Sequence, residues 1–238
     1  WSDLSSTIPE SGNLFCMASI QDNVARIEER IVAACDAAGR SRDEVRLMAV
    51  SKLQPAERIE EAIALGLRLF GESRVQETKG RRDLFPSDAD VHLIGHLQRN
   101  KAKDAATMYN AIQSIDAVRT LNAVERHLDE SDRSMEIMLE VNTSGESNKY
   151  GVADYDALRA LAEAVVDAPR CTLTGVMTIG PLTGDESDNR RAFARLREYR
   201  DRLQRDLAVA LPELSMGMSG DMEAAIAEGS TMVRIGTA

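Results

Sequence analysis

The sequence of 238 residues is poor in cysteine, in aromatic residues and in long apolar runs. Its three cysteines are widely spaced and form no C-x-x-C pair, which argues against a disulfide framework and a zinc site and favours a reducing cytoplasm. No apolar run reaches the length of a transmembrane helix. Residues 1–16 lack the basic leader and apolar core of a secretory signal, so we expect a disordered or cloning-derived extension outside the fold.

The sequence also has fewer basic residues than acidic ones. There are 29 lysines and arginines against 39 aspartates and glutamates, which gives a net charge of −10. This balance excludes the basic surface of a nucleic-acid-binding protein, but it leaves room for a small pocket that binds a phosphate group. Hydrophobic residues make up 43% of the chain, as in ordinary soluble proteins. A chain of this length buries enough surface to fold without a disulfide or a metal.

Beyond the extension, apolar stretches alternate with amphipathic helical patterns. A helix over 20–38 precedes eight strand candidates near 45–51, 67–71, 91–95, 110–115, 135–142, 171–179, 213–218 and 231–235. Helical patterns separate them near 55–65, 73–83, 98–107, 118–129, 154–167, 186–209 and 220–228. This α/β alternation predicts a single (β/α)8 TIM-type barrel over residues 17–238, with helix 20–38 in the place of the eighth outer helix. An open doubly wound sheet is the alternative, although no G-x-G-x-x-G follows the first strand.

Lys52 ends the first strand candidate, which is otherwise almost wholly apolar. Because burial of an ammonium group is costly, a lysine in this place needs a reason. A desolvated lysine loses its proton more easily and can form a Schiff base with an aldehyde. Alternatively, Lys52 only marks the end of the strand and extends its amine into water. The residues that lie near Lys52 in the predicted fold are needed to distinguish these two interpretations.

The loop after the seventh strand carries the next candidates, because barrels often bind phosphate at the loops after strands seven and eight. Ser219 offers a hydroxyl, while Gly220 and Asp221 lead into a helix with backbone N–H groups that suit an anion. Ser219 or Asp221 could equally serve only as a helix cap. The pattern therefore predicts an anion site, with capping as the structural alternative.

The eighth strand carries Arg234, a charge among apolar neighbours that needs a carboxylate or a ligand as its partner. Gly236 permits a close approach of the backbone, and Thr237 adds a hydroxyl and an N–H group. Closure of the barrel would place the first strand beside the eighth and bring Lys52 to this phosphate-binding loop pair. A lysine that forms Schiff bases beside a phosphate site predicts a pyridoxal 5'-phosphate (PLP) site. A class I aldolase-like barrel that acts on a sugar phosphate is an alternative.

Seven short motifs run in order along the predicted barrel: Ala49–Lys52, Phe70–Glu72, His92–Gln98 with Asn100–Lys101, Val141–Glu146 with Lys149, Gly175–Ile179, Leu214–Asp221 and Val233–Thr237. Together they resemble the pyridoxal phosphate homeostasis proteins, also called the YggS or PROSC family. These are single-domain barrels related to the N-terminal domain of alanine racemase. Two features depart from the family: Ser73 follows Phe-Gly-Glu where asparagine is usual, and the family continues for a further short segment beyond Ala238.

The resemblance implies that Lys52 holds PLP as a Schiff base and that Arg234 faces the pyridine nitrogen. The residues it implies for the phosphate group are Ser219, Gly220, Gly236 and Thr237. An arginine beside the ring nitrogen disfavours a protonated ring, which suits racemisation or plain binding better than transamination. The resemblance also implies that PLP passes to PLP-dependent apo-enzymes.

We therefore expect a cytoplasmic, non-catalytic PLP carrier, a monomer rather than an obligate dimer, with no nucleic-acid or membrane partner. A racemase needs a second base, in the related racemases a tyrosine from a separate domain after the barrel, and none of the four tyrosines falls in a motif over the cofactor. A PLP-dependent amino-acid racemase or a lyase is the alternative. His92 and His96 lie four residues apart, but without a carboxylate ligand they do not predict a metal site.

Overall fold

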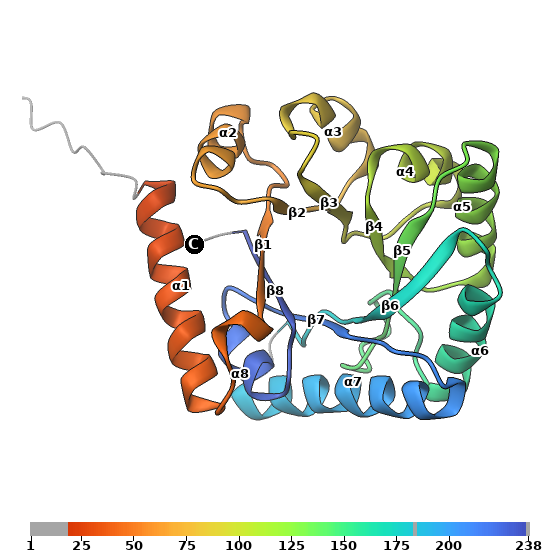
Figure 1. Ribbon diagram of the computed structural model, residues 1–238. Coiled ribbons are helices and arrows are strands. Elements are labelled where there is room, and N and C mark those ends of the chain that lie inside the picture. The colour runs from red at the N-terminus through yellow and green to blue at the C-terminus, as the bar shows by residue number, and fades with distance from the viewer. Residues whose placement is uncertain (1–18, 183–184, 237–238) are drawn as a thin grey trace, which may run out of the picture.

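The structure is a computed structural model that describes residues 19–182 and 185–236. Within those residues, eight parallel strands close into one barrel in sequence order, with the last strand paired to the first (Figure 1). The strands are β1 (Arg46–Val50), β2 (Leu69–Glu72), β3 (Asp90–Leu93), β4 (Ala111–Ile115), β5 (Met135–Glu140), β6 (Cys171–Met177), β7 (Glu213–Met218) and β8 (Met232–Ile235). The predicted TIM-type barrel is confirmed, and the open sheet is wrong.

Helices cover the barrel from outside (Figure 1). They are α1 (Ile20–Ala37), α2 (Ala56–Ala64), α3 (Val75–Lys79), α4 (Ala102–Met108), α5 (Val118–Glu130), α6 (Tyr155–Val166), α7 (Glu186–Leu207) and α8 (Met222–Ala227). Three single 3-10 turns accompany them: η1 (Arg42–Glu44), η2 (Arg82–Leu84) and η3 (Arg99–Lys101). The helix predicted over 73–83 is divided into α3 and η2 at Gly80, because glycine is a poor helix former.

Helix α1 precedes the first strand yet completes the outer ring between α2 and α8 (Figure 1). Ser19 caps its start, since the hydroxyl accepts a hydrogen bond from the Asp22 N–H at 3.0 Å. The inner face of α1 packs on β8 and α8 in a set that we call the seam cluster: Ile27, Ile31, Ala34, Cys35, Val45, Met222, Ile226, Val233 and Ile235. Helix α1 thus occupies the place that the sequence predicts for it.

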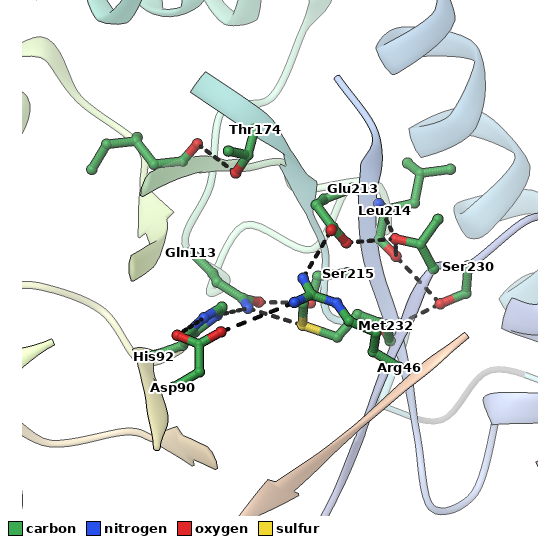
Figure 2. Close-up of polar contacts among 12 residues, drawn as sticks. Arg46, Asp90, His92, Gln113, Thr174, Glu213, Leu214, Ser215, Ser230 and Met232 are labelled. Carbon is green, nitrogen blue, oxygen red and sulfur yellow. Dashed lines mark hydrogen bonds and ion pairs between the residues drawn. The ribbon is translucent and has the colours of Figure 1, made fainter. Parts of the chain in front are cut away.

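The strands present apolar side chains to the helices and several polar side chains to the interior of the barrel. Gln113 on β4 bonds to Ser215 on β7, three strands around the barrel, so both side chains must point inward (Figure 2). His92 on β3 and Arg234 on β8 join the same interior set. Barrel interiors are usually filled by branched aliphatic side chains. A polar interior is therefore the unusual feature of this fold.

Two predictions concern the ends of the chain. The extension predicted over residues 1–16 and the predicted phosphate ligand Thr237 both lie outside the described residues. None of the helices in the described part of the chain is both long enough and apolar enough to cross a bilayer.

Candidate functional site

The carboxyl ends of β7, β8 and β1 lie side by side at one rim of the barrel. Met218 of β7 pairs with Arg234 of β8, and Ile235 of β8 pairs with Ala49 of β1. The loops that follow these strands therefore start next to one another, as barrel closure requires. The predicted cofactor ligands that the structure describes all lie on these three strands or directly after them: Lys52, Ser219, Gly220, Arg234 and Gly236.

Lys52 is exposed at this rim, two residues beyond the end of β1. The expectation of a desolvated lysine is therefore wrong, because the strand ends at Val50 and Lys52 lies on the turn that follows. The next residue, Leu53, has a φ of 61° and is 77% exposed. A leucine in the left-handed region is strained, and such strain concentrates at functional sites. The amine of Lys52 is thus open to an aldehyde that arrives from solvent.

A buried ion pair holds the turn that carries Lys52. Ser51 Oγ donates to Glu72 Oε1 at 2.6 Å, and Arg81 Nη2 lies 2.6 Å from Glu72 Oε2. Arg81 Nη1 also donates to the Gln54 carbonyl at 3.2 Å. Glu72 is fully buried, and hydrogen bonds that involve charged groups are the stronger ones. The pair therefore fixes the chain on both sides of Lys52.

The loop after β7 keeps hydrogen-bond donors available. Neither the Ser219 hydroxyl nor the Gly220 N–H bonds to any residue that the structure describes, and a Cβ atom at Gly220 would meet nothing within 4 Å. Asp221 is the N-cap residue of α8, but its side chain makes no capping hydrogen bond and its Oδ1 accepts instead from the Met218 N–H at 2.5 Å. Burial raises the pKa of Asp221. Arg30 Nη2 donates to the Ser219 carbonyl at 3.0 Å and holds the loop in place.

Close contact with β1 limits the side chain at Gly236. A Cβ atom there would come within 3.1 Å of the Val50 Cβ atom and 3.3 Å of the Val50 carbonyl oxygen. That approach is tighter than ordinary van der Waals contact, so glycine suits this position where β8 meets β1. The end of β8 thus presents backbone rather than a side chain to the rim.

Arg234 lies inside the barrel, only 4% exposed, with both ends of its guanidinium engaged. Nη1 donates to Ser215 Oγ and Nη2 to the Thr178 carbonyl, both at 2.7 Å. Burial lowers the pKa of Arg234 to about 10, against the opposing charges of Asp221 and Glu140. At that value the side chain remains a cation near neutral pH. The rim therefore has a fixed positive charge below it.

Glu140 is a buried charge that the sequence analysis did not single out. It ends β5, is 6% exposed, and its Oε2 has no hydrogen-bond partner among the described residues. Burial, followed by the charge of Asp116, raises the pKa of Glu140 to about 7, although Arg234 opposes the rise. The signal was present in the sequence, because a charge at the carboxyl end of an apolar strand is the pattern that singled out Lys52.

An aromatic pair lies in the loops after β3 and β5, on the same side of the barrel as the rim. The rings of His96 and Tyr150 stack with centroids 3.8 Å apart, and His96 Nδ1 lies 3.6 Å from Asp116 Oδ2. Tyr150 is therefore a tyrosine on the same side of the barrel as Lys52, which the motifs did not reveal. His92, in contrast, contacts Gln113 inside the barrel. Across residues 19–182 and 185–236, no three His, Cys, Asp or Glu side chains gather as a metal site would require.

The chain is similar to known proteins over nearly its whole length. The family model described as alanine racemase, N-terminal domain, matches residues 18–238. The pyridoxal phosphate homeostasis protein of Pseudomonas aeruginosa is 43% identical, covering 93% of this chain and 95% of its own. The protein of the same name from Aquifex aeolicus is 41% identical, covering 91% and 95%. A structure of PipY from Synechococcus elongatus with PLP bound has a TM-score of 0.77 at 35% identity, covering 89% of this chain and 98% of that one.

Proposed function

The chain belongs to the family of pyridoxal phosphate homeostasis proteins, and from that premise we propose that it binds PLP at the rim and takes part in PLP homeostasis. PLP brings an aldehyde that condenses with a lysine, a phosphate group and a pyridine nitrogen. The donors at the rim suit these three groups. The observation that carries the proposal is the exposed Lys52 after β1, at the same rim as the unbonded hydroxyl and N–H of the loop after β7, two strands away.

Each residue has one role in this proposal. Lys52 holds the aldehyde carbon through a Schiff base, and Arg234 faces the pyridine nitrogen from below. The phosphate group is held by the hydroxyl, N–H and close backbone of four residues: Ser219, Gly220, Gly236 and Thr237. Three of them are supported by the donors and the close approach described above, and Thr237 by the sequence motif alone.

We propose that the chain carries PLP and does not turn over a substrate. Arg234 is a cation with both ends hydrogen-bonded, and a cation beside the pyridine nitrogen disfavours a proton there. A ring without that proton withdraws electrons weakly, which suits plain binding or racemisation better than transamination. The exposed turn at Lys52 leaves the linkage reachable, so recipient apo-enzymes can collect the cofactor.

The setting of the protein is also part of the proposal. We place it in the cytoplasm as a monomer, with PLP-dependent apo-enzymes as its partners and no nucleic acid. Cys35 and Cys171 are free and buried, as expected in a reducing compartment, and the net charge of −10 disfavours contact with nucleic acid.

Borohydride trapping tests the site directly. The purified protein is incubated with PLP, freed of excess, reduced and mapped by peptide mass; we expect the pyridoxyl group on Lys52. Lys52→Ala should weaken PLP binding at least tenfold, because it removes the amine that forms the Schiff base. Lys103→Ala, which removes an exposed lysine on α4, is the matched control and should bind as the wild type does.

Three outcomes would contradict this function. A label spread evenly over surface lysines would remove Lys52 from its role. Racemisation of any amino acid in a broad panel, abolished by Lys52→Ala, would replace carriage by the racemase alternative. Trapping of a sugar phosphate on Lys52, with no PLP taken up, would favour the aldolase alternative.

A further inference from the structure

A chain of polar contacts crosses the interior of the barrel from Arg234 to the opposite mouth. It is hydrogen-bonded as far as His92, and its last contact, between His92 and Asp90, is a close approach without hydrogen-bond geometry. Arg234 Nη1 donates to Ser215 Oγ at 2.7 Å, and Ser215 Oγ donates to Gln113 Oε1 at 2.6 Å. Gln113 Nε2 lies 2.8 Å from His92 Nδ1, and His92 Nε2 lies 2.9 Å from Asp90 Oδ1. Figure 2 shows the part from Ser215 to Asp90. Five side chains from β3, β4, β7 and β8 thus form one connected path.

Burial makes this path rigid. Gln113 and Ser215 are at most 1% exposed, as is His92, and Arg234 is 4% exposed. A buried polar group that loses its partner destabilises the folded state, so each link penalises movement of its neighbours. The hydrogen bonds that join Arg234, Ser215 and Gln113 favour one arrangement of these three side chains.

The donors of the path point in a single direction. Arg234 can only donate, so the Ser215 hydroxyl accepts from it and gives its own hydrogen to Gln113 Oε1. The Gln113 amide nitrogen must then face His92, and the same nitrogen donates its second hydrogen to the Met232 sulfur, which lies 3.1 Å from Nε2. His92 Nδ1 is therefore the acceptor, and the ring hydrogen lies on Nε2, toward Asp90. The orientation of Arg234 and the tautomer of His92 are thus linked.

The far end of the path reaches solvent at the amino ends of the strands. Asp90 begins β3, and its side chain is 40% exposed. Arg46, at the start of β1, lies 4.0 Å from Asp90 and donates to Glu213 Oε1 at 2.8 Å (Figure 2). Burial alone would raise the pKa of Asp90, but the close approach of the His92 ring N–H and the charge of Arg46 outweigh it and lower that pKa. The path is therefore anchored by an ionised carboxylate at the mouth opposite Lys52.

We propose that His92 and Gln113 are positioning residues for Arg234, so that the orientation of its guanidinium toward the cofactor is fixed from the opposite mouth of the barrel. The link to the cofactor rests on the proposed function, whereas the link between Gln113 and Arg234 does not. If Gln113 were reversed, its amide nitrogen would face Ser215 Oγ, and the buried serine hydroxyl would lose the acceptor of its own hydrogen. The present orientation of Gln113 therefore fixes the hydroxyl of Ser215 with its lone pairs toward Arg234.

Two serines offer a matched pair of variants. Ser215 and Ser230 are both fully buried, and Ser230 Oγ donates to the Met216 carbonyl at 2.7 Å, outside the path. Ser215→Ala breaks the path next to Arg234, Gln113→Leu breaks it one link further away, and Ser230→Ala leaves it whole. Ser215→Ala and Ser230→Ala each remove one buried hydroxyl, so a difference between these two variants reports the path rather than the loss of a buried polar group.

The first measurement uses the protein without PLP. Nitrogen–proton NMR follows the guanidinium N–H signals of Arg234, assigned by their absence in Arg234→Lys. In Ser215→Ala and Gln113→Leu we expect these hydrogens to exchange with water at least tenfold faster than in the wild type. In Ser230→Ala the exchange rate should stay within twofold. If Gln113→Leu does not fold, Ser215→Ala together with His92→Phe decides the result.

The second measurement uses the PLP-loaded protein and the absorption of the bound cofactor. Gln113→Leu should shift the pH midpoint of that absorption, because Arg234 no longer faces the ring in one orientation, and Ser230→Ala should leave it unchanged. Arg234 signals that are identical in Gln113→Leu and the wild type would overturn the proposal, as would equal changes in Ser230→Ala. Failure of the wild type to take up PLP would count against the proposed function alone, since the NMR result does not depend on the cofactor.

Discussion

Replacing Glu140 by glutamine should remove a pH-dependent cost from the folded state. The carboxyl group is 6% exposed, and its Oε2 has no hydrogen-bond partner among the described residues. Burial and the charge of Asp116 raise its pKa from an ordinary 4.5 to about 7. Glutamine has nearly the same shape and cannot ionise. The substitution therefore changes the charge and little else.

The sign of the effect follows from the two pKa values of Glu140. Below pH 4.5 the carboxyl is protonated in both the folded and the unfolded chain, and the full stability is present. As pH rises toward 7, the unfolded chain releases the proton while the folded chain keeps it, so stability falls by about 1.4 kcal/mol per pH unit. Above the folded pKa the loss levels off at roughly 3 kcal/mol. The free energy of unfolding of Glu140→Gln should not show this decrease with pH, because glutamine does not ionise.

Urea unfolding at two pH values measures the effect. We expect Glu140→Gln to exceed the wild type in free energy of unfolding by less than about 1 kcal/mol at pH 5 and by about 3 kcal/mol at pH 8. Glu136→Gln, on the same strand but exposed, is the control and should stay within about 0.5 kcal/mol of the wild type at both pH values. An equal gain at both pH values, or a loss at pH 8, would refute the reasoning.

Two further substitutions probe the turn that carries Lys52. Leu53→Asn should stabilise the protein by up to about 1 kcal/mol, since asparagine tolerates a positive φ and Leu53 buries little surface; a lower melting temperature would contradict the strain. Arg81→Met should destabilise by about 3–5 kcal/mol, because it leaves the buried Glu72 carboxylate without its cation. Urea unfolding checks this, and a cost below 1 kcal/mol would mean that water takes the place of the guanidinium.

The alternation of strands and helices made the fold predictable from the sequence. Strands buried on both faces are apolar on successive residues, and the pattern over 45–51 or 213–218 shows this directly. The place of α1 followed from the count of helices. Element ends were harder, as at Gly80, because they depend on one or two residues and on tertiary contacts.

The candidate site was predictable in part. Arg234 stood out as a charge in an apolar strand, and its burial agrees with that signal. Lys52 gave the same signal, but the sequence could not show that the turn after β1 exposes its side chain to solvent. Glu136 and Glu140 lie four residues apart on one strand, but only Glu140 is buried. The difference depends on which loops, distant in sequence, pack over each end of the strand. Tyr150 lies in an irregular loop, where no periodic pattern indicates position.

The hydrogen-bond path through the interior was beyond sequence analysis for a related reason. His92, Gln113 and Ser215 are each visible as polar residues within apolar strands. Their partnership depends on which strands face one another across the closed barrel and on the register between them. Neither property is encoded in the local pattern of a single strand.

The seam cluster has a consequence for the order of folding. It joins α1 and β1 to α8 and β8, and Arg40 beside it donates to the carbonyl of Ile226, 186 positions later in the chain. Contacts of such long sequence separation carry a high loop-closure cost and form late. Substitutions in the seam should therefore speed unfolding more than they slow folding. Strand β8 pairs with both β1 and β7, so the rim forms only once the barrel has closed. A ligand that contacts these strands would bind only the closed barrel and would therefore stabilise it against opening.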